Sequence, residues 1–169
     1  MDKVEIEKYL HMLGEELSAK QLNFDILLLG GAAMVLEVGN RDATQDIDTF
    51  FLPDTTAIFR AAAVVAAREN LPDGWLNSAA AGFTYNFKKQ PSVKLWKTFP
   101  GLQVYLPSIE YLFVTKIMAS RRKDRGDIMA LAAMLHISKR EEVFRIVVQY
   151  IASDEIAQEV VEEIRLLFE

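Results

Sequence analysis

A pair of glycines directly after a short apolar run is the feature that most constrains this chain. Residues 24–29 read Phe-Asp-Ile-Leu-Leu-Leu and end in Gly30-Gly31, after which residues 32–38 are again mostly apolar. A run this short, followed by glycine, predicts a buried strand that turns sharply into a short helix. Any tight turn of this kind favours glycine. Glycine also lets the backbone approach a ligand, and a helix start offers free N–H groups, so the turn suits a phosphate.

An Asp-x-Asp motif lies in the next predicted strand, residues 47–51. Neighbouring side chains of a strand point to opposite faces, so Asp46 and Asp48 should stand side by side while Ile47 faces the core. Two adjacent carboxylates repel each other unless a cation compensates, and Mg²⁺ binds carboxylate and phosphate oxygens together. The pair therefore predicts a Mg²⁺ site. The alternative is an exposed strand edge with two solvated acids.

The rest of the chain separates into a mixed half and a helical half. Helical periodicity covers residues 3–22 and 56–70, and short strands are expected at 83–87, 93–96 and 102–106. Later helices are expected over 108–120 and 127–135, from Ser138 in a capping box with Glu141, and from Ser153.

This order predicts an α+β fold with a mixed sheet flanked by helices. The sheet and its helices should form an α/β module over residues 1–107. A C-terminal helical module over residues 108–169 should pack on it, giving a single compact domain.

Composition excludes several classes of site and partner. The chain has no cysteine and only two histidines, so disulfides, thiolate zinc sites and cysteine nucleophiles are excluded. No apolar run reaches the roughly 18–20 residues of a membrane span, and the first residues do not resemble a secretory signal. We therefore expect a cytoplasmic protein with no membrane partner. The net charge of −5 gives no reason to expect DNA binding.

The charge distribution is less uniform than the net charge. Residues 74–109 contain no Asp or Glu but carry four lysines, Lys88, Lys89, Lys94 and Lys97. A run of this kind is most often a solvated face. It also favours a phosphate-rich partner such as RNA.

The two motifs occur in the order strand, Gly-Gly, short helix, loop and strand with Asp-x-Asp. In this order they resemble the active-site core of the DNA polymerase β-like nucleotidyltransferase superfamily. The segments that carry the resemblance are 29–36, Leu-Gly-Gly-Ala-Ala-Met-Val-Leu, and 41–48, Arg-Asp-Ala-Thr-Gln-Asp-Ile-Asp. They look most like the small bacterial branch that includes the abortive-infection nucleotidyltransferase toxins. A second match runs from Leu-Pro-Ser at 106–108 through Lys116 to Asp127.

The resemblance implies transfer of a nucleoside monophosphate from an NTP to an acceptor, with release of pyrophosphate. The acceptor would be an RNA end, a protein or a small molecule, and an antitoxin protein is a further expected partner. Asp46 and Asp48 would hold Mg²⁺. The residues expected to bind the nucleotide are Gly30, Gly31, Arg41, Thr44 and Lys116.

One element of the superfamily pattern is missing. Its members usually carry a third carboxylate on a later strand as the base for the acceptor, whereas the later strands here hold Gln103 and Tyr105 at the corresponding place. Either Asp124 or Asp127 substitutes, the acceptor reacts without a base, or the chain is a catalytically lapsed nucleotide-binding module. Asp127 is the expected base, because Asp124 lies among cationic neighbours. A helical interaction protein would leave the Gly-Gly and Asp-x-Asp motifs unexplained.

Overall fold

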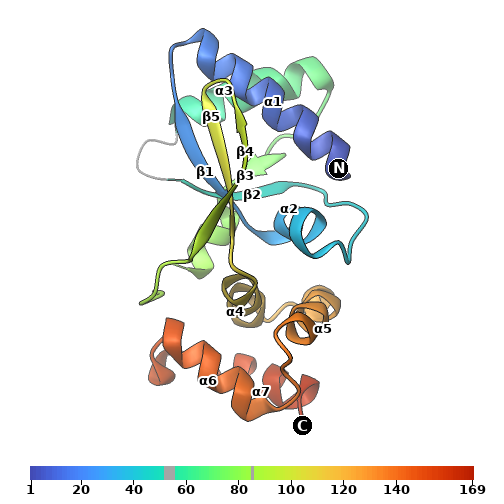
Figure 1. Cartoon of the computed structure of the whole chain (residues 1–169), viewed down its shortest axis with the longest axis vertical. Helices are drawn as coiled ribbons and strands as arrows, with labels where there is room; N and C mark the ends of the chain where they lie inside the picture. Colours follow the sequence, from blue (N-terminus) through green and yellow to red (C-terminus); the bar gives the residue numbers. More distant parts are fainter. Residues whose placement is uncertain (52–55, 85) are drawn as a thin grey trace. The chain divides into compact units, whose positions relative to one another are not determined.

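The computed structural model describes residues 1–51, 56–84 and 86–169. The chain divides into two compact units (Figure 1). The sheet unit comprises residues 1–81 and 93–107, and the helical unit comprises residues 82–92 and 108–169. The α+β fold with a mixed sheet, flanking helices and C-terminal helices is confirmed.

The described residues form a sheet of five strands in the order β3-β2-β1-β5-β4. Their bounds are Phe24–Leu28 for β1, Ile47–Phe51 for β2, Leu76–Asn77 for β3, Val93–Phe99 for β4 and Leu102–Pro107 for β5. Strand β1 pairs antiparallel with β2 and parallel with β5, so the sheet is mixed. Strand β4 lies at one edge, antiparallel to β5, and carries an irregularity in register between Leu95 and Lys97.

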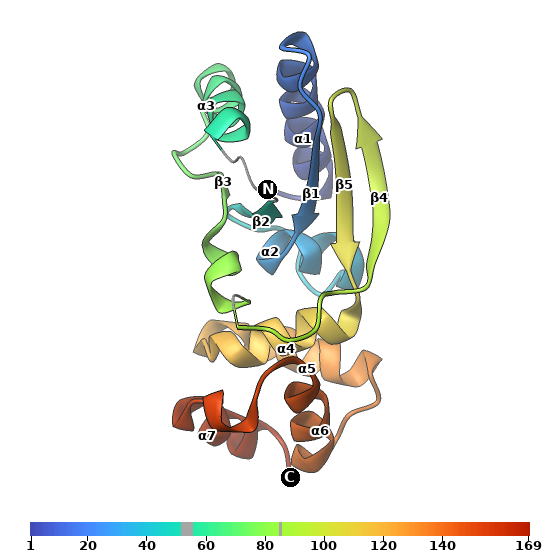
Figure 2. The same ribbon diagram turned by 90° about the vertical axis from the view of Figure 1, so that its left-hand side faces the viewer.

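Two helices of the sheet unit, α1 (Lys3–Ala19) and α3 (Thr56–Glu69), pack against each other and against the sheet. Helix α1 begins in a capping box, in which the side chain of Asp2 accepts from the backbone N–H of Glu5 at 2.9 Å. It runs behind β1 and β5 in Figure 2. The indole N–H of Trp75 donates to the carbonyl of Ala62 at 3.0 Å, which ties α3 to the segment that leads into β3.

The two faces of the sheet differ in burial. Side chains that point toward α1 and α3 are almost fully buried, and they include Ile26, Leu28, Ile47 and Val104. The alternate residues of the same strands are partly or fully exposed, among them Asp25, Leu27, Asp48 and Gln103. The sheet therefore has one core face and one open face.

Strand β1 leads directly into a short helical segment. Helix α2 (Gly30–Ala33) continues as a π-helical turn over Met34–Val38, which ends at Gly39 in the left-handed conformation. The strand, glycine pair and helix that the sequence predicts are therefore present. The π-helical turn was not expected, since no sequence pattern distinguishes it from α-helix.

The described residues of the helical unit form four α-helices: α4 (Ile109–Ala119), α5 (Arg125–Met134), α6 (Arg140–Tyr150) and α7 (Gln158–Leu167). Ser108 caps α4, because its hydroxyl oxygen accepts from the backbone N–H of Tyr111 at 3.3 Å. Residues 82–92 belong to this unit through the backbone N–H of Lys88, which donates to the carbonyl of Tyr150 at 2.6 Å. Among the described residues, no helix is long and apolar enough to cross a membrane.

Three local expectations are wrong: one strand, one capping residue and the start of one helix. The strand expected at 83–87 is absent, because Phe83 ends a 3₁₀ helix (Ala79–Phe83) and the flanking described residues lie in turns, while Tyr85 is outside the described residues. The capping acid of α6 is Glu142 rather than Glu141, since Glu142 accepts from the backbone N–H groups of residues 138 and 139. The segment from Ser153 forms only a 3₁₀ turn (Ser153–Glu155), and the last helix starts later.

Candidate functional site

The two aspartates of the Asp-x-Asp motif lie at the start of β2 on the open face of the sheet. Asp48 is in the strand and Asp46 is in the bend just before it, and both side chains are half-buried. Ile47 and Thr49 alternate with them and are fully buried. The two carboxylates therefore share a face that remains partly accessible to solvent, as strand alternation requires.

Gly30 brings Asp48 against the backbone that follows β1. The residue has a φ of +57°, and a Cβ built on it would lie only 2.1 Å from Oδ2 of Asp48. A side chain here would be strained by the backbone conformation and would also collide with the carboxylate. Glycine at this position thus allows one Asp of the motif to sit directly over the strand-to-helix turn. The backbone N–H of Leu29 donates to the carbonyl of Asp48 at 2.8 Å and fixes the same approach.

Gly31 makes the equivalent space for the loop between α2 and β2. A Cβ at Gly31 would lie 2.1 Å from Oγ1 of Thr44 and 3.9 Å from Nη1 of Arg41. The Thr44 hydroxyl donates to the carbonyl of Asp46 at 3.1 Å, so this loop folds back onto the motif. The space beside the Gly31 Cα is therefore filled by the chain's own Thr44. A larger residue at Gly31 would disturb this packing before it met any ligand.

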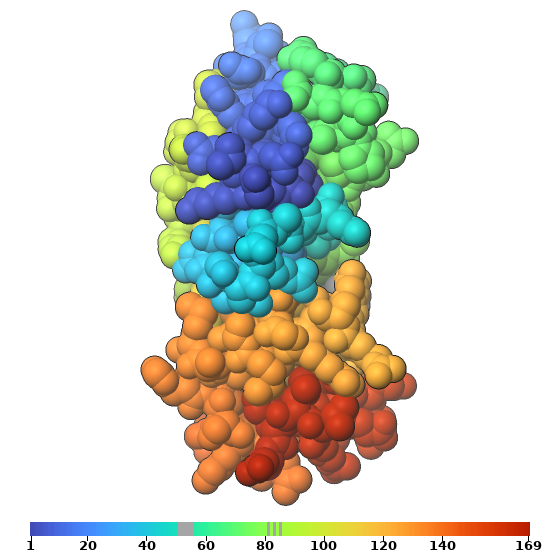
Figure 3. Space-filling view, turned by 90° about the vertical axis from the view of Figure 1, so that its right-hand side faces the viewer, coloured from blue at the N-terminus to red at the C-terminus, as the bar shows by residue number. Residues whose placement is uncertain are grey.

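The same loop also contacts the beginning of the chain. The backbone N–H of Thr44 donates to the carbonyl of Met1 at 2.9 Å. In Figure 3 the cyan residues of this loop lie beside the start of α1, drawn in dark blue. The loop is thus held on one side by Gly31 and on the other by the N-terminal segment.

Asn77 is a site residue that the sequence did not indicate. It lies on β3 in register with Asp48, and its side-chain amide donates to Oδ2 of Asp46 at 3.0 Å. Its side-chain oxygen accepts from the backbone N–H of Ala79 at 2.9 Å, which fixes the orientation of the amide. A strand of two residues leaves no periodic signal, so Asn77 could not be connected with the motif beforehand.

The carboxylate pair fits a hard divalent cation. Asp46 and Asp48 supply oxygen ligands at one place, and the described residues contain no group of three or more His, Cys, Asp or Glu that could enclose an ion. A metal held by two carboxylates must take its other ligands from water or from a bound substrate. Mg²⁺ usually binds in this way, through one or two carboxylates together with nucleotide phosphates.

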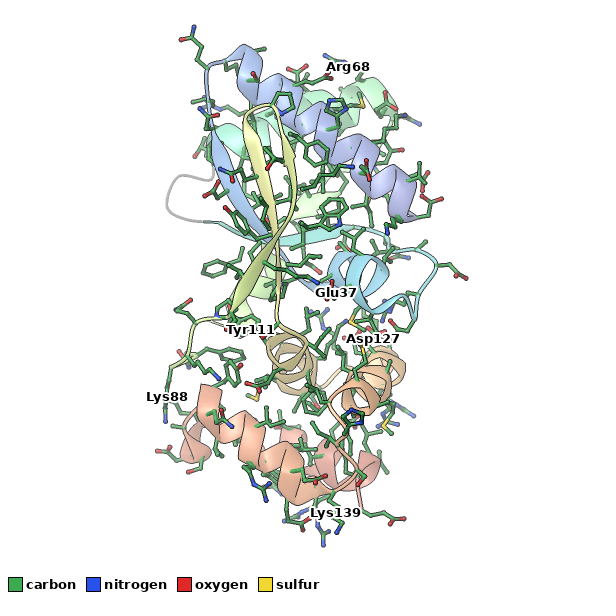
Figure 4. All side chains as sticks on the ribbon, in the orientation of Figure 1. Glu37, Arg68, Lys88, Tyr111, Asp127 and Lys139 are labelled. Atoms are coloured by element: carbon green, nitrogen blue, oxygen red, sulfur yellow. The ribbon has the colours of Figure 1, made fainter. Side chains whose placement is uncertain are left out.

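Lys116 and the predicted base Asp127 lie together in the helical unit. Nζ of Lys116, on α4, is 2.8 Å from Oδ1 of Asp124 and 2.9 Å from Oδ2 of Asp127, at the start of α5. The three residues are buried, with exposed fractions of 6% for Lys116, 3% for Asp124 and 2% for Asp127 (Asp127 is labelled in Figure 4). One cation is thus shared by two carboxylates, and the cluster joins α4 to α5.

The structure therefore collects the predicted residues into two groups. The sheet unit brings together Gly30, Gly31, Arg41, Thr44, Asp46 and Asp48. The helical unit brings Lys116 to Asp127. Asp124 also contacts Lys116, which sequence analysis did not expect.

Three lysines of the acid-free stretch are paired with glutamates from elsewhere in the chain. Lys94 is 2.5 Å from Glu37, and Lys97 contacts Glu7 of α1. Lys89 is 3.2 Å from Glu110 in the helical unit. These pairs are exposed and individually weak, but each places a carboxylate beside the lysine. The stretch is therefore less basic in the folded protein than in the sequence.

Strand β5 carries no acid at the place where a third carboxylate was sought. Gln103 and Tyr105 lie on the open face of this strand, opposite Asp25 and Leu27 of β1. The hydroxyl of Tyr105 donates to Oε1 of Gln103 at 3.2 Å. Neither side chain is a carboxylate, the group that the superfamily pattern has at this place.

Comparison with known proteins gives one match. A family model described as a nucleotidyltransferase of unknown function (DUF6036) matches residues 8–159, which is most of the chain. The match includes every residue discussed above as a candidate for the site. Searches of the curated proteins and of the solved structures gave no significant match.

Proposed function

Because the chain belongs to the family of nucleotidyltransferases of unknown function (DUF6036), we propose that it transfers a nucleoside monophosphate from an NTP to an acceptor, with Asp46 and Asp48 holding Mg²⁺. The observation that carries the proposal is the position of Asp48 over Gly30, beside Asp46, on the open face of the sheet. The Gly-Gly and Asp-x-Asp elements of the family resemblance both lie in the sheet unit.

The proposed division of labour follows from the contacts of these residues. Mg²⁺, when bound, would neutralise the triphosphate and favour departure of pyrophosphate. Asp46 and Asp48 supply the carboxylate oxygens, and Asn77 holds the Asp46 side chain in place by its amide hydrogen bond. Nη1 of Arg41 lies 3.9 Å from the Cβ position of Gly31, so we assign this guanidinium to the phosphates. Thr44 orients the loop through the Asp46 carbonyl.

Lys116 and Asp127 have either a structural or a catalytic role in this proposal, and the variants described in the Discussion separate the two. Their ion pair supports a structural role in the helical unit, and the second sequence match supports a catalytic one. Transfer without a base on β5 would require that Asp127 or solvent accept the proton of the acceptor. A lapsed enzyme that only binds nucleotide is the alternative, favoured by Gln103 and Tyr105 on that strand.

The test is nucleotide binding by isosteric variants. Wild type is titrated with each of the four NTPs in the presence of Mg²⁺ and again with EDTA. We expect binding of at least one NTP that weakens at least tenfold in EDTA, in Asp46→Asn and in Asp48→Asn. Asp42→Asn is the matched control, because Asp42 is an exposed acid of the same loop. If wild type binds none of the four NTPs, the proposed function is wrong.

Stability measurements on the same variants show whether a loss of NTP binding is caused by unfolding of the protein. The free energy of unfolding of each variant is measured by urea denaturation, so that a loss of binding can be separated from a loss of folded protein. Transfer is then measured with α-labelled NTP. Binding without transfer to any acceptor would favour the lapsed module over the enzyme.

The resemblance to abortive-infection toxins extends the proposal to a cellular role. An active toxin should slow growth when it is produced in bacteria, and Asp48→Asn should remove this effect at equal protein level. An antitoxin protein would then be sought as a factor that restores growth. Equal growth with wild type and Asp48→Asn would contradict the toxin assignment without affecting the assignment of the reaction.

A further inference from the structure

A row of apolar side chains crosses the open face of the sheet next to the carboxylates. The strand registers place Leu95 opposite Tyr105, Tyr105 opposite Leu27, and Leu27 opposite Phe50. Residues directly opposite one another in a sheet point to the same side, so these four side chains form one line across β4, β5, β1 and β2. All four are at least partly exposed, and Leu95 is 51% exposed.

The row is continuous with the carboxylates. Phe50 and Asp48 are two residues apart on β2 and therefore lie on the same face, roughly 7 Å apart along the strand. Four strands at about 4.8 Å spacing give the row a length of roughly 14 Å. A group bound along this line would have one end beside Asp48, where the proposed reaction takes place.

The charges that the strands and the bend before β2 place on this face are negative. Asp25, Asp46 and Asp48 lie on it, whereas the two lysines of β4 do not: Lys94 is in register with Leu106 and Lys97 with Val104, which belong to the core face. The described strands thus place no cation on the open face. An RNA acceptor would need cations along its phosphates, and its affinity would fall for each one missing. An uncharged, apolar acceptor fits both the row and its surroundings.

We propose that this row binds the acceptor, and that the acceptor is a protein segment in which a serine, threonine or tyrosine hydroxyl is flanked by apolar side chains. The inference rests on the proposed function and names its substrate class. The hydroxyl oxygen forms a bond to the α-phosphorus of the NTP, and the bond from that phosphorus to the departing pyrophosphate breaks. The hydroxyl proton passes to Asp127 or to water, the two acceptors named under the proposed function. A row of this length matches several side chains of an extended peptide better than one small molecule.

The experiment compares acceptors directly, with the full chain, Mg²⁺ and the α-labelled NTP that it binds. One peptide pool carries a central Ser, Thr or Tyr among degenerate apolar residues, and a matched pool carries the same centre among degenerate acidic residues. The third acceptor is an oligoribonucleotide of equal length with a free 3′-hydroxyl. We expect label in the apolar pool at a level at least tenfold above the other two.

Variants then connect the label to the row. Leu95→Glu should raise the KM for the apolar pool at least tenfold without changing NTP affinity, because Leu95 lies at the far end of the row from Asp48. Val64→Glu, an exposed position on α3, is the control with the same charge change and should behave as wild type.

The outcomes separate this inference from the proposed function. NTP binding with label in the oligoribonucleotide, in the acidic pool or in no acceptor overturns the protein acceptor alone. An unchanged KM in Leu95→Glu overturns the row as its binding surface. Absence of NTP binding overturns the proposed function and this inference together.

Discussion

Each unit of the molecule contains a pair of aspartates close together in sequence, and the two pairs are in opposite environments. Asp46 and Asp48 in the sheet unit are half-buried on an open face, where an Asn77 amide contacts one of them. Asp124 and Asp127 in the helical unit are buried and share the ammonium group of Lys116.

Both pairs consist of aspartates, so the difference between them lies in burial and in the groups that contact them. A buried carboxylate is stable only when it is paired, so Asp124 and Asp127 have their charge compensated by the protein itself. A half-exposed carboxylate keeps part of its hydration and can exchange water for a metal ion or a substrate. The same residue type therefore stabilises the helical unit in one case and is proposed to bind a ligand in the other. The predictions below test this contrast from the largest expected effect to the smallest.

The largest effect is expected for Lys116→Met. The substitution keeps most of the side-chain volume but leaves two buried carboxylates without their shared cation. Loss of one partner from a buried ion pair costs about 3–5 kcal/mol, and we expect a loss of unfolding free energy in this range from urea denaturation. Lys123→Met, at an exposed lysine close in sequence, should change it by less than about 0.5 kcal/mol. Equal stability of the two variants would contradict the structural role of Lys116.

Gly30→Ala tests the other side of the comparison, the close approach of Asp48 to the turn. The left-handed backbone at Gly30 costs an Ala about 1–2 kcal/mol, and the collision with Asp48 adds to it, for a total of roughly 2–4 kcal/mol. Gly39→Ala is the matched control. Gly39 has a φ of +68° but nothing within 4 Å of its Cβ position, so it reports the backbone strain alone. If both variants lose the same stability, Asp48 does not press on Gly30.

The predictable part of this fold followed from short-range patterns. The run 24–29 with Gly30-Gly31 specifies a buried strand and a turn, and the alternation around Ile47 specifies which face carries the carboxylates. The strand, the turn and the face of the carboxylates follow from side-chain alternation and from glycine's backbone freedom, both of which depend only on residues close in sequence.

The unpredictable part depends on contacts between distant residues. Lys94 and Lys97 appeared to form a basic stretch because Glu37 and Glu7, 57 and 90 residues away, could not be assigned to them. The aromatic alternation ending at Phe87 imitates a strand, but Phe87 instead packs on the rings of Tyr111 and Tyr150 in the helical unit. The burial of Lys116 was likewise hidden, because a lysine in a helix is usually solvated.

Two single variants, Asp124→Asn and Asp127→Asn, test whether the two buried aspartates of the helical unit have the same role. Each substitution removes one of the two charges that hold Lys116, so each should cost roughly 1–3 kcal/mol. If both residues serve only Lys116, transfer activity at low temperature should be equal in the two variants. We predict that Asp127→Asn loses transfer at least tenfold more than Asp124→Asn while both still bind NTP. Equal activities at matched stability would remove Asp127 from the catalytic residues.

The smallest effect concerns the ion pair that joins α5 to α7. Nε and Nη2 of Arg125 are 2.6 and 2.7 Å from the two carboxylate oxygens of Glu163. The Arg125 hydrogen bonds, and secondarily its charge, hold the pKa of the Glu163 carboxyl below its usual value. A lowered pKa in the folded protein means that the pair's contribution is complete above the unfolded glutamate pKa of about 4.3 and disappears as the pH falls below it.

Glu163→Gln should therefore have a lower free energy of unfolding than wild type at pH 7. In urea denaturation this gap should persist at pH 5 and narrow at pH 3.5. Glu159→Gln, at an exposed glutamate of the same helix, should show no comparable gap at pH 7. A gap that narrows at low pH would show that the Glu163 charge is compensated within the protein, by Arg125. A constant gap between Glu163→Gln and wild type at all three values would mean that packing, and not the charge of Glu163, stabilises this contact.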